Sequence, residues 1–238
     1  APTGSASQSF CSGASPTVAD LTATGAGIQW YAASSGGTAL ATSTVLVHAT
    51  HYYASQTING CESTSRLDVT ATINTTPAAP TGASEQSFCS STSPTVADLT
   101  ATGTVIQWYA AASGGTALAT STSLVNGAHY YASQTVSGCE STARFDVTAT
   151  VNTTPAAPTG TAAQSFCSAA SPTIADLTAT GTAIQWYSSP GGGIPLATTI
   201  FLGNGNHYYA SQTVTGCEST LRFDVAVTVN TTPFAPTG

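Results

Sequence analysis

Six cysteines are the residues of this sequence with the clearest chemistry, and they recur at regular intervals. Two series each advance in steps of 78 residues, namely Cys11, Cys89 and Cys167, and Cys61, Cys139 and Cys217. Six cysteines allow 15 pairings. The repeat symmetry favours three equivalent bridges, Cys11–Cys61, Cys89–Cys139 and Cys167–Cys217, and such bridges predict an oxidising compartment. Buried free thiols are the alternative, whereas zinc ligation is disfavoured because no Cys-x-x-Cys pair occurs.

Histidines and carboxylates are the next candidates for chemistry. A histidine precedes each Tyr-Tyr pair, at His51, His129 and His207. A catalytic histidine needs a nucleophile and an orienting acid, and neither a Gly-x-Ser-x-Gly nor a His-x-x-x-His motif is present. The sequence therefore predicts structural histidines at strand ends, no enzyme, and no catalytic or cofactor-binding residues.

The acidic residues of each copy are isolated in sequence. In the first copy they are Asp20, Glu62 and Asp68. Extracellular β-repeats often bind Ca²⁺ through clustered carboxylates, so Ca²⁺ is a candidate cofactor. The simpler interpretation is an ion pair of Arg66 with Asp68 or with Glu62.

Tyrosines are the candidate contact residues. Adjacent strand residues face opposite sides, so one of Tyr52 and Tyr53 points outward. An outward tyrosine could stack on a sugar ring or contact a neighbouring repeat. The candidate ligand or inter-domain contacts are Tyr31, Tyr53, Tyr109, Tyr131, Tyr187 and Tyr209.

The charge composition excludes several classes of partner. The chain has three basic and ten acidic residues, a net charge of −7, and only 5% charged residues, against roughly 25% in ordinary soluble proteins. A negative chain repels a polyanion, so no nucleic-acid partner is predicted. No apolar run approaches the roughly 20 residues that cross a bilayer, so no transmembrane segment is predicted.

The 78-residue period defines the domain organisation. It predicts domains at residues 1–78, 79–156 and 157–234, with residues 235–238 as the start of a further repeat. Each junction carries the motif Asn-Thr-Thr-Pro-(Ala/Phe)-Ala-Pro-Thr-Gly, as in residues 74–82. Two prolines within four residues favour an extended, semi-rigid connector, so we expect the domains to lie end to end.

Within one copy, short alternating segments predict strands. In residues 66–74, Leu67, Val69, Ala71 and Ile73 alternate with polar residues, which is typical of a half-buried strand. Further strands are expected at residues 8–11, 17–24, 28–31, 39–42, 44–47 and 51–58. About seven short strands separated by turns predict an all-β sandwich.

Three motifs occur in order in every copy. In the first copy they are Ser9-Phe-Cys-Ser12, Gln29-Trp-Tyr31 and Gly60-Cys-Glu-Ser63. With this spacing the chain resembles the Ig-like tandem repeats of large secreted and cell-surface proteins of Bacteroidota, of the type IX secretion and gliding-motility-associated adhesin type. The resemblance implies an Ig-like fold, an extracellular or cell-surface location, and a spacer or adhesive role.

The cysteines depart from the antibody pattern. Cys61 follows Tyr53 by eight residues and falls at a predicted hairpin turn. We therefore expect a bridge that pins the first strand to the last hairpin, not a buried inter-sheet disulfide.

The predicted function is structural. We expect spacer or adhesin repeats of a long extracellular surface protein or filament, with neighbouring repeats, self-association into filaments and surface glycans as the candidate partners. A multivalent glycan-binding module, repeated for avidity, is the alternative.

Overall fold

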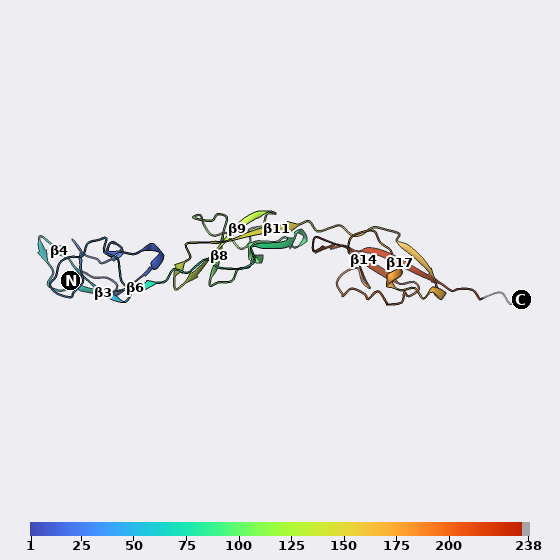
Figure 1. Ribbon diagram of the computed structural model, residues 1–238, viewed down its shortest axis with the longest axis horizontal. Coiled ribbons are helices and arrows are strands. Elements are labelled where there is room, and N and C mark those ends of the chain that lie inside the picture. The colour runs from blue at the N-terminus through green and yellow to red at the C-terminus, as the bar shows by residue number, and fades with distance from the viewer. Residues whose placement is uncertain (235–238) are drawn as a thin grey trace. The chain divides into compact units, whose positions relative to one another are not determined.

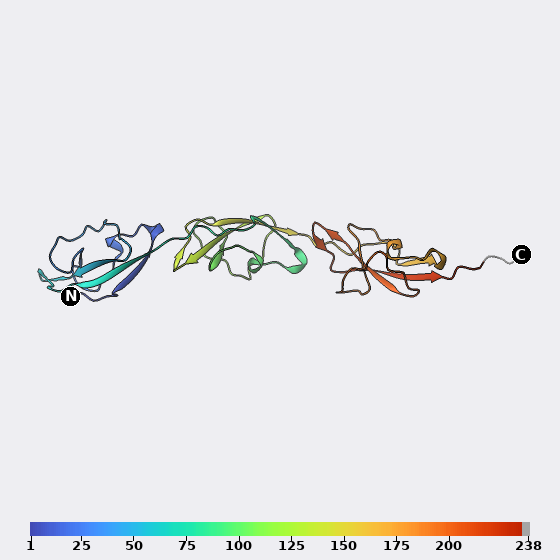
Figure 2. The same ribbon diagram turned by 60° about the horizontal axis from the view of Figure 1, so that its bottom comes forward.

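The computed structural model describes residues 1–234 as an all-β chain in which one strand pattern occurs three times (Figures 1 and 2). The predicted start of a further repeat, residues 235–238, lies outside the described residues. The chain divides into two compact units. Unit 1 comprises Ala1–Ser84, Thr100–Ala119 and His129–Val147, and unit 2 comprises Glu85–Leu99, Thr120–Ala128 and Thr148–Gly238. The first repeat lies in unit 1 and the third in unit 2, while the second contributes to both.

The first repeat is organised around one four-stranded sheet of order β1-β6-β3-β2. A two-residue hairpin, β4–β5, extends beyond it. Its strands are β1 (Ser7–Cys11), β2 (Gln29–Tyr31), β3 (Thr50–Ser55), β4 (Thr57–Ile58), β5 (Cys61–Glu62) and β6 (Leu67–Asn74), and its short 3-10 turns are η1 (Ser12–Ala14) and η2 (Val18–Asp20).

Strand direction within this sheet determines where the cysteines lie. β1 runs parallel to β6 and places Cys11 opposite Asn74, at the carboxyl end of β6. β3 runs antiparallel to β6, with Ala54 opposite Leu67, so β3 ends beside the start of β6. The β4–β5 hairpin follows β3 directly and therefore belongs to the opposite end of the repeat from Cys11.

The core lies between this sheet and a layer of turns and single β-bridges. Side chains that alternate along β3 and β6, among them Tyr52, Ala54, Val69 and Ala71, are buried on the inner face. The covering layer comes from the segments around η2 and around Leu46, which a single bridge between Thr17 and Val45 joins. The period-2 pattern of residues 66–74 thus predicted the buried face of β6 correctly.

Two expected strands are absent from the described residues. Within residues 17–24 the chain forms the η2 turn at Val18–Asp20 and a single bridge at Thr24 instead, because the Asp20 carboxylate accepts the backbone N–H of Thr17 at 2.7 Å and stabilises a tight turn. Residues 39–42 are not a strand either, although the Leu40 N–H donates to the Trp30 carbonyl at 2.7 Å. Residues 44–47 contribute only the bridge at Val45.

The later repeats have equivalent elements, except that one continuous strand, β9, replaces the pair β3 and β4 in the second repeat. In the second they are β7 (Glu85–Cys89), η3 (Ser90–Thr92), η4 (Val96–Asp98), β8 (Ile106–Tyr109), β9 (Ala128–Val136), β10 (Cys139–Glu140) and β11 (Phe145–Asn152). In the third they are β12 (Ala163–Cys167), η5 (Ser168–Ala170), η6 (Ile174–Asp176), β13 (Gln185–Tyr187), β14 (His207–Ser211), β15 (Thr213–Val214), β16 (Cys217–Glu218) and β17 (Phe223–Asn230). The third sheet repeats the order of the first, and β14 and β17 lie side by side in Figure 1.

Candidate functional site: a cystine joint between successive repeats

The disulfides join successive repeats and do not close single ones. Cys11 is bonded to Cys139 within unit 1, and Cys89 is bonded to Cys217 within unit 2. In both bridges the Cα atoms are 5.6 Å apart and the partners are separated by 128 residues. The predicted pairing of Cys11 with Cys61, and its two equivalents, is therefore wrong.

Strand geometry explains why a bridge inside one repeat cannot form. Cys11 lies at the carboxyl end of β6, and the hairpin that carries Cys61 lies beyond its amino end. β6 has eight residues, so at about 3.3 Å per residue these two ends are roughly 23 Å apart. A disulfide needs Cα atoms about 4.4–6.8 Å apart. The strand-end cysteine therefore needs a hairpin cysteine from another repeat.

A tight turn presents the hairpin cysteine. The two residues before Cys139, Ser137 and Gly138, have φ values of +49° and +79°, and the equivalent residues before Cys217 have +49° and +82°. Positive φ at both central positions is characteristic of the type I′ turn, which favours Asn-Gly. The first repeat has that pair at Asn59 and Gly60, and the turn brings the cysteine to the tip of its hairpin.

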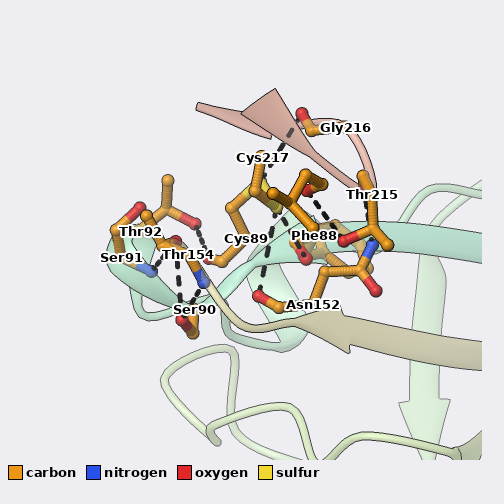
Figure 3. Close-up of a disulfide and its surroundings, with 11 residues drawn as sticks. Phe88, Cys89, Ser90, Ser91, Thr92, Asn152, Thr154, Thr215, Gly216 and Cys217 are labelled. Atoms are coloured by element: carbon orange, nitrogen blue, oxygen red, sulfur yellow. Dashed lines mark hydrogen bonds between the residues drawn. A yellow bond between two sulfur atoms is a disulfide. The ribbon is translucent and has the colours of Figure 1, made fainter. Parts of the chain in front are cut away.

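An asparagine side chain locks each bridge. In unit 2 the Asn152 amide donates to the Thr215 carbonyl at 3.0 Å, beside the bond between Cys89 and Cys217 (Figure 3). In unit 1 Asn74 donates to the Ser137 carbonyl at 2.9 Å. The bridge sulfurs have no proton to donate, and they approach backbone carbonyl oxygens at 3.9–4.0 Å as close contacts.

The connector that leaves each repeat is anchored beside the bridge. The Thr154 N–H donates to the Ser90 hydroxyl at 3.0 Å, and the Thr154 hydroxyl accepts the Ser91 N–H at 3.0 Å (Figure 3). Further along the connector of unit 1, the Gln134 amide donates to the Ala78 carbonyl at 2.9 Å. In the first connector the corresponding anchors are Thr76, which bonds to Ser12 and Gly13, and Ala78, so hydrogen bonds hold its first half to the flanking repeats.

Formation of the joint buries the hairpin tip. Cys139 and Cys217 are each 1% exposed, whereas Cys61, the equivalent residue of the first repeat, is exposed. Cys167, the last strand-end cysteine, is exposed as well. Within residues 1–234 these two are the free cysteines.

The first set of candidate tyrosines is used inside the repeats. Tyr31 is only 5% exposed, and the Arg66 guanidinium carbon lies 3.4 Å from its ring centroid. The Tyr31 hydroxyl donates to Glu62 at 2.7 Å. Tyr109 and Tyr187 are buried in the same way beneath Arg144 and Arg222. Tyr31, Tyr109 and Tyr187 were predicted as ligand or inter-domain contacts, but cation–π stacking and burial within their own repeats already occupy their ring faces.

This cluster shifts the pKa of its carboxylate. The hydroxyl of Ser55 and then that of Tyr31 hold the pKa of Glu62 below its usual value of 4.5; burial opposes them, and the charge of Arg66 lowers the pKa by a lesser amount. Of the two hydroxyls, only Tyr31 meets hydrogen-bond geometry, because the buried Ser55 hydroxyl has no bonded partner. The pKa values of Glu140 and Glu218 are lowered by the equivalent serine, tyrosine and arginine of their own repeats. Burial, and then the adjacent glutamate, raises the pKa of Tyr109 and of Tyr187.

The second set of tyrosines lies on the outer face of the sheet. Tyr53 is half-buried, and its ring stacks on that of His51, with centroids 6.3 Å apart. His51 Nδ1 in turn lies 2.8 Å from Asp68. Tyr131 and Tyr209 have equivalent partners. The recurring histidines thus form cross-strand pairs with aspartates, an arrangement typical of a structural role.

The carboxylates are dispersed over different partners. Asp20 accepts the N–H of Thr17, Glu62 the hydroxyl of Tyr31, and Asp68 faces His51. Arg66 pairs with neither predicted acid and donates to the carbonyls of Ala33 and Gly36 at 2.7 and 2.9 Å. Among residues 1–234, no three His, Cys, Asp or Glu side chains lie close enough together to hold a metal ion.

Sequence reasoning missed the locking asparagine and the Ser–Thr anchor. A signal for both exists, since Asn74, Asn152 and Asn230 occur at the end of the last strand of every repeat, each followed two residues later by a threonine. A polar residue kept at a strand end in all copies of a repeat indicates a junction contact.

The fold and the joint together define the chain as a tandem array of Ig-like β-sandwich repeats. The family model described as "Ig-like domain CHU_C associated" matches residues 1–74, 77–152 and 155–231, and the chain belongs to this family. The family is associated with type IX secretion proteins of Bacteroidota, and with two disulfides it indicates an extracellular protein.

Other comparisons add little. No curated protein matches the chain. Among solved structures, the extracellular domains 3–5 of Drosophila OTK are similar at 12% identity, with 85% of each chain covered and a TM-score of 0.26. Within residues 1–234, no helix has the length and apolar character needed to span a bilayer.

Proposed function

We propose that this chain is a spacer: a run of structural or adhesin repeats in a long extracellular surface protein or filament, with no enzymatic activity. The observation that carries the proposal is the pairing of Cys11 with Cys139 and of Cys89 with Cys217. A domain that needed only its own stability would close a disulfide on itself. Bridges between successive repeats instead restrict movement at the junction, which is the property that a spacer requires.

The contacts beside each bridge support the same proposal. The locking asparagine, the Ser–Thr anchor and the glutamine that donates to a connector carbonyl each use a hydrogen bond to limit movement at the junction. Each such bond contributes about 1 kcal/mol. Predicted domains at residues 1–78, 79–156 and 157–234, end to end with short connectors, would form a long and stiff object.

Small-angle X-ray scattering of the oxidised chain tests this proposal. Each repeat should add about 30–40 Å, which gives a maximum dimension of about 100 Å or more. The matched control is the same chain with Cys11→Ser and Cys139→Ser, which keeps its repeats but loses one bridge. We expect a broader distribution of dimensions in the variant. A compact particle for the oxidised wild type would contradict the spacer function.

A multivalent glycan-binding module is the second candidate, and the position of Tyr53 favours it. The ring is half-buried on the outer sheet face, and Tyr131 and Tyr209 repeat it. An aromatic ring on an open face can stack on a sugar. A glycan array tests this function, with a triple Tyr→Phe variant at these positions as the control that keeps the ring. Failure to bind any glycan would leave the spacer function alone.

A further inference from the structure

The hairpin cysteine of the first bridge is followed directly by a glutamate that is fixed to the body of its own repeat. Glu140 comes after Cys139 on β10, and the Tyr109 hydroxyl on β8 donates to its Oε1 at 2.7 Å. The hydroxyl has one proton, and Gln107 Oε1 is the second acceptor near it, at 3.0 Å. The carboxylate is both closer and charged, so it is the stronger acceptor.

The tyrosine that holds this glutamate is itself held in place. Tyr109 is 5% exposed, and the Arg144 guanidinium carbon lies 3.4 Å from the centroid of its ring. Arg144 also donates to the carbonyls of Ala111 and Gly114, at 2.7 and 2.8 Å. A buried ring beneath a tethered guanidinium has little room to move. Its hydroxyl therefore limits where the hairpin residue beside the bridge can lie.

The hairpin has few backbone contacts of its own. β10 has two residues, and within residues 1–234 its pairing partner is β9, through Cys139 with Val136 and Glu140 with Thr135. A two-stranded hairpin is at best marginally stable alone. A side-chain bond from Glu140 to the sheet therefore adds substantially to what fixes the direction of Cys139.

The second bridge has the same arrangement in the third repeat. Glu218 follows Cys217 on β16, and its Oε1 accepts the Tyr187 hydroxyl at 2.7 Å. The Arg222 guanidinium carbon lies 3.3 Å from the centroid of the Tyr187 ring. Each bridge thus has a tyrosine–glutamate bond beside its hairpin cysteine, and the two bonds belong to different repeats.

We propose that Tyr109 and Glu140 are positioning residues of the joint, which hold the hairpin where Cys139 meets Cys11 and so make the bridge harder to reduce. The equivalent pair in the third repeat does the same for the second bridge. The inference rests on the proposed spacer function, because it assigns two further residues to the joint that this function requires. A hairpin that is already oriented loses less conformational freedom when its sulfur bonds.

Exchange with glutathione is the equilibrium that measures this effect. One glutathione thiolate attacks a bridge sulfur and forms a mixed disulfide, and a second attacks that mixed disulfide and releases oxidised glutathione. The bridge gains two electrons, and the two protons from glutathione end on the two protein thiols. If the reduced hairpin keeps its orientation, closure of the bridge is favoured and its reduction potential is lower.

The test is the reduction potential of each bridge in the full chain, measured in glutathione buffers by alkylation and peptide mass spectrometry. All samples carry Cys61→Ser and Cys167→Ser, so that these two thiols do not exchange with the bridges. Tyr109→Phe keeps the ring and its stack and removes the hydroxyl. We expect the equilibrium to shift about tenfold toward reduction of the first bridge, which raises its potential by about 30 mV. The potential of the second bridge should not change.

The third repeat supplies the matched control. Tyr187→Phe should raise the potential of the second bridge and leave that of the first unchanged. Glu140→Ala should match Tyr109→Phe in its effect on the first bridge. The variant with both of these substitutions should be no easier to reduce than either alone, because each removes the same bond.

Three results would overturn the proposal. The first is an unchanged potential of the first bridge in Tyr109→Phe. The second is an equal shift of both bridges in that variant, because the second repeat carries one cysteine of each bridge, Cys89 and Cys139, and its general destabilisation would affect both. The third is full additivity of Tyr109→Phe and Glu140→Ala, which would mean that the two residues act separately. Scattering from the oxidised chain tests the spacer function without reference to these potentials, so the two failures are distinguishable.

Discussion

Removal of the first bridge should both destabilise the chain and change which of its pieces stay connected. The perturbation is the pair of substitutions Cys11→Ser and Cys139→Ser. The bridge spans 128 residues, and the chain-entropy relation gives about 5 kcal/mol for a loop of that length, roughly 1 kcal/mol more than for the 50-residue loop of a bridge inside one repeat. Because small domains have only about 5–15 kcal/mol of stability, urea unfolding followed by tryptophan fluorescence should show the loss clearly.

The connectivity assay is more decisive than the energy. Trypsin cuts after arginine and lysine, and the three basic residues here are Arg66, Arg144 and Arg222. We expect the denatured but unreduced wild type, cut at all three, to keep fragments 1–66, 67–144 and 145–222 joined, because each bridge links one fragment to the next. In the double variant, fragment 1–66 should separate without reductant.

Release of all three fragments from the unreduced wild type would refute the reasoning, since it would mean that each bridge closes within its own repeat. The control is the chain with Cys61→Ser and Cys167→Ser, which should behave as the wild type in both assays. Alkylation before reduction should label Cys61 and Cys167 and leave the other four cysteines unlabelled.

Three further substitutions test the contacts around the joint and the arginine cluster. Asn152→Ala should lower the free energy of unfolding by about 1 kcal/mol and speed reduction of the bond between Cys89 and Cys217. The matched Asn230→Ala should change neither. Urea unfolding and timed reduction measure the two effects. Glu140→Gln should lower the melting temperature at neutral pH and flatten its decline in acid. A carboxyl whose folded pKa lies below its usual 4.5 adds stability above that pH and loses it as the pH falls through the folded value; equal melting curves from pH 7 to pH 3 would contradict this. Arg144→Lys should lower the free energy of unfolding, measured with urea, by about 1–2 kcal/mol. A lysine ammonium replaces neither the stack on Tyr109 nor the hydrogen bonds to two carbonyl groups. An unchanged urea midpoint would show that the cluster adds no stability.

Periodicity in the sequence was sufficient to predict the repeat and the main strands. The alternation of residues 66–74 predicts a strand with one buried face, which is β6. The Asn59–Gly60 pair predicts a hairpin turn, which is that of the β4–β5 hairpin. The Ig-like fold was predicted from motifs in the same way and is confirmed. Residues 17–24 were misassigned as a strand because the bond between Asp20 and Thr17 stabilises a local turn that competes with strand pairing.

The disulfide pairing needed information that no local pattern contains. The cysteine spacing is compatible with a bridge inside one repeat, Cys11–Cys61, and equally with a bridge between successive repeats, Cys11–Cys139. Both pairings have the same repeat symmetry. The pairing is decided by β1, which lies parallel to β6 and places Cys11 at the end of the repeat opposite the hairpin that carries Cys61. Parallel pairing between β1 and β6, whose partner residues such as Ser7 and Thr70 are far apart in the sequence, is a long-range property. Local propensity does not determine it.

The overlapping bridges also determine how the chain would carry a pulling force. Between residues 1 and 234 the shortest covalent route runs to Cys11, across to Cys139, back along the chain to Cys89, across to Cys217 and onward. That route uses about 80 residues, so even a fully unravelled chain would extend to only about 280 Å, against roughly 800 Å without bridges. The segments 12–88 and 140–216 lie off this route and would carry no load. The first and third repeats could lose their folds under load, and the molecule would still yield only a third of its contour length.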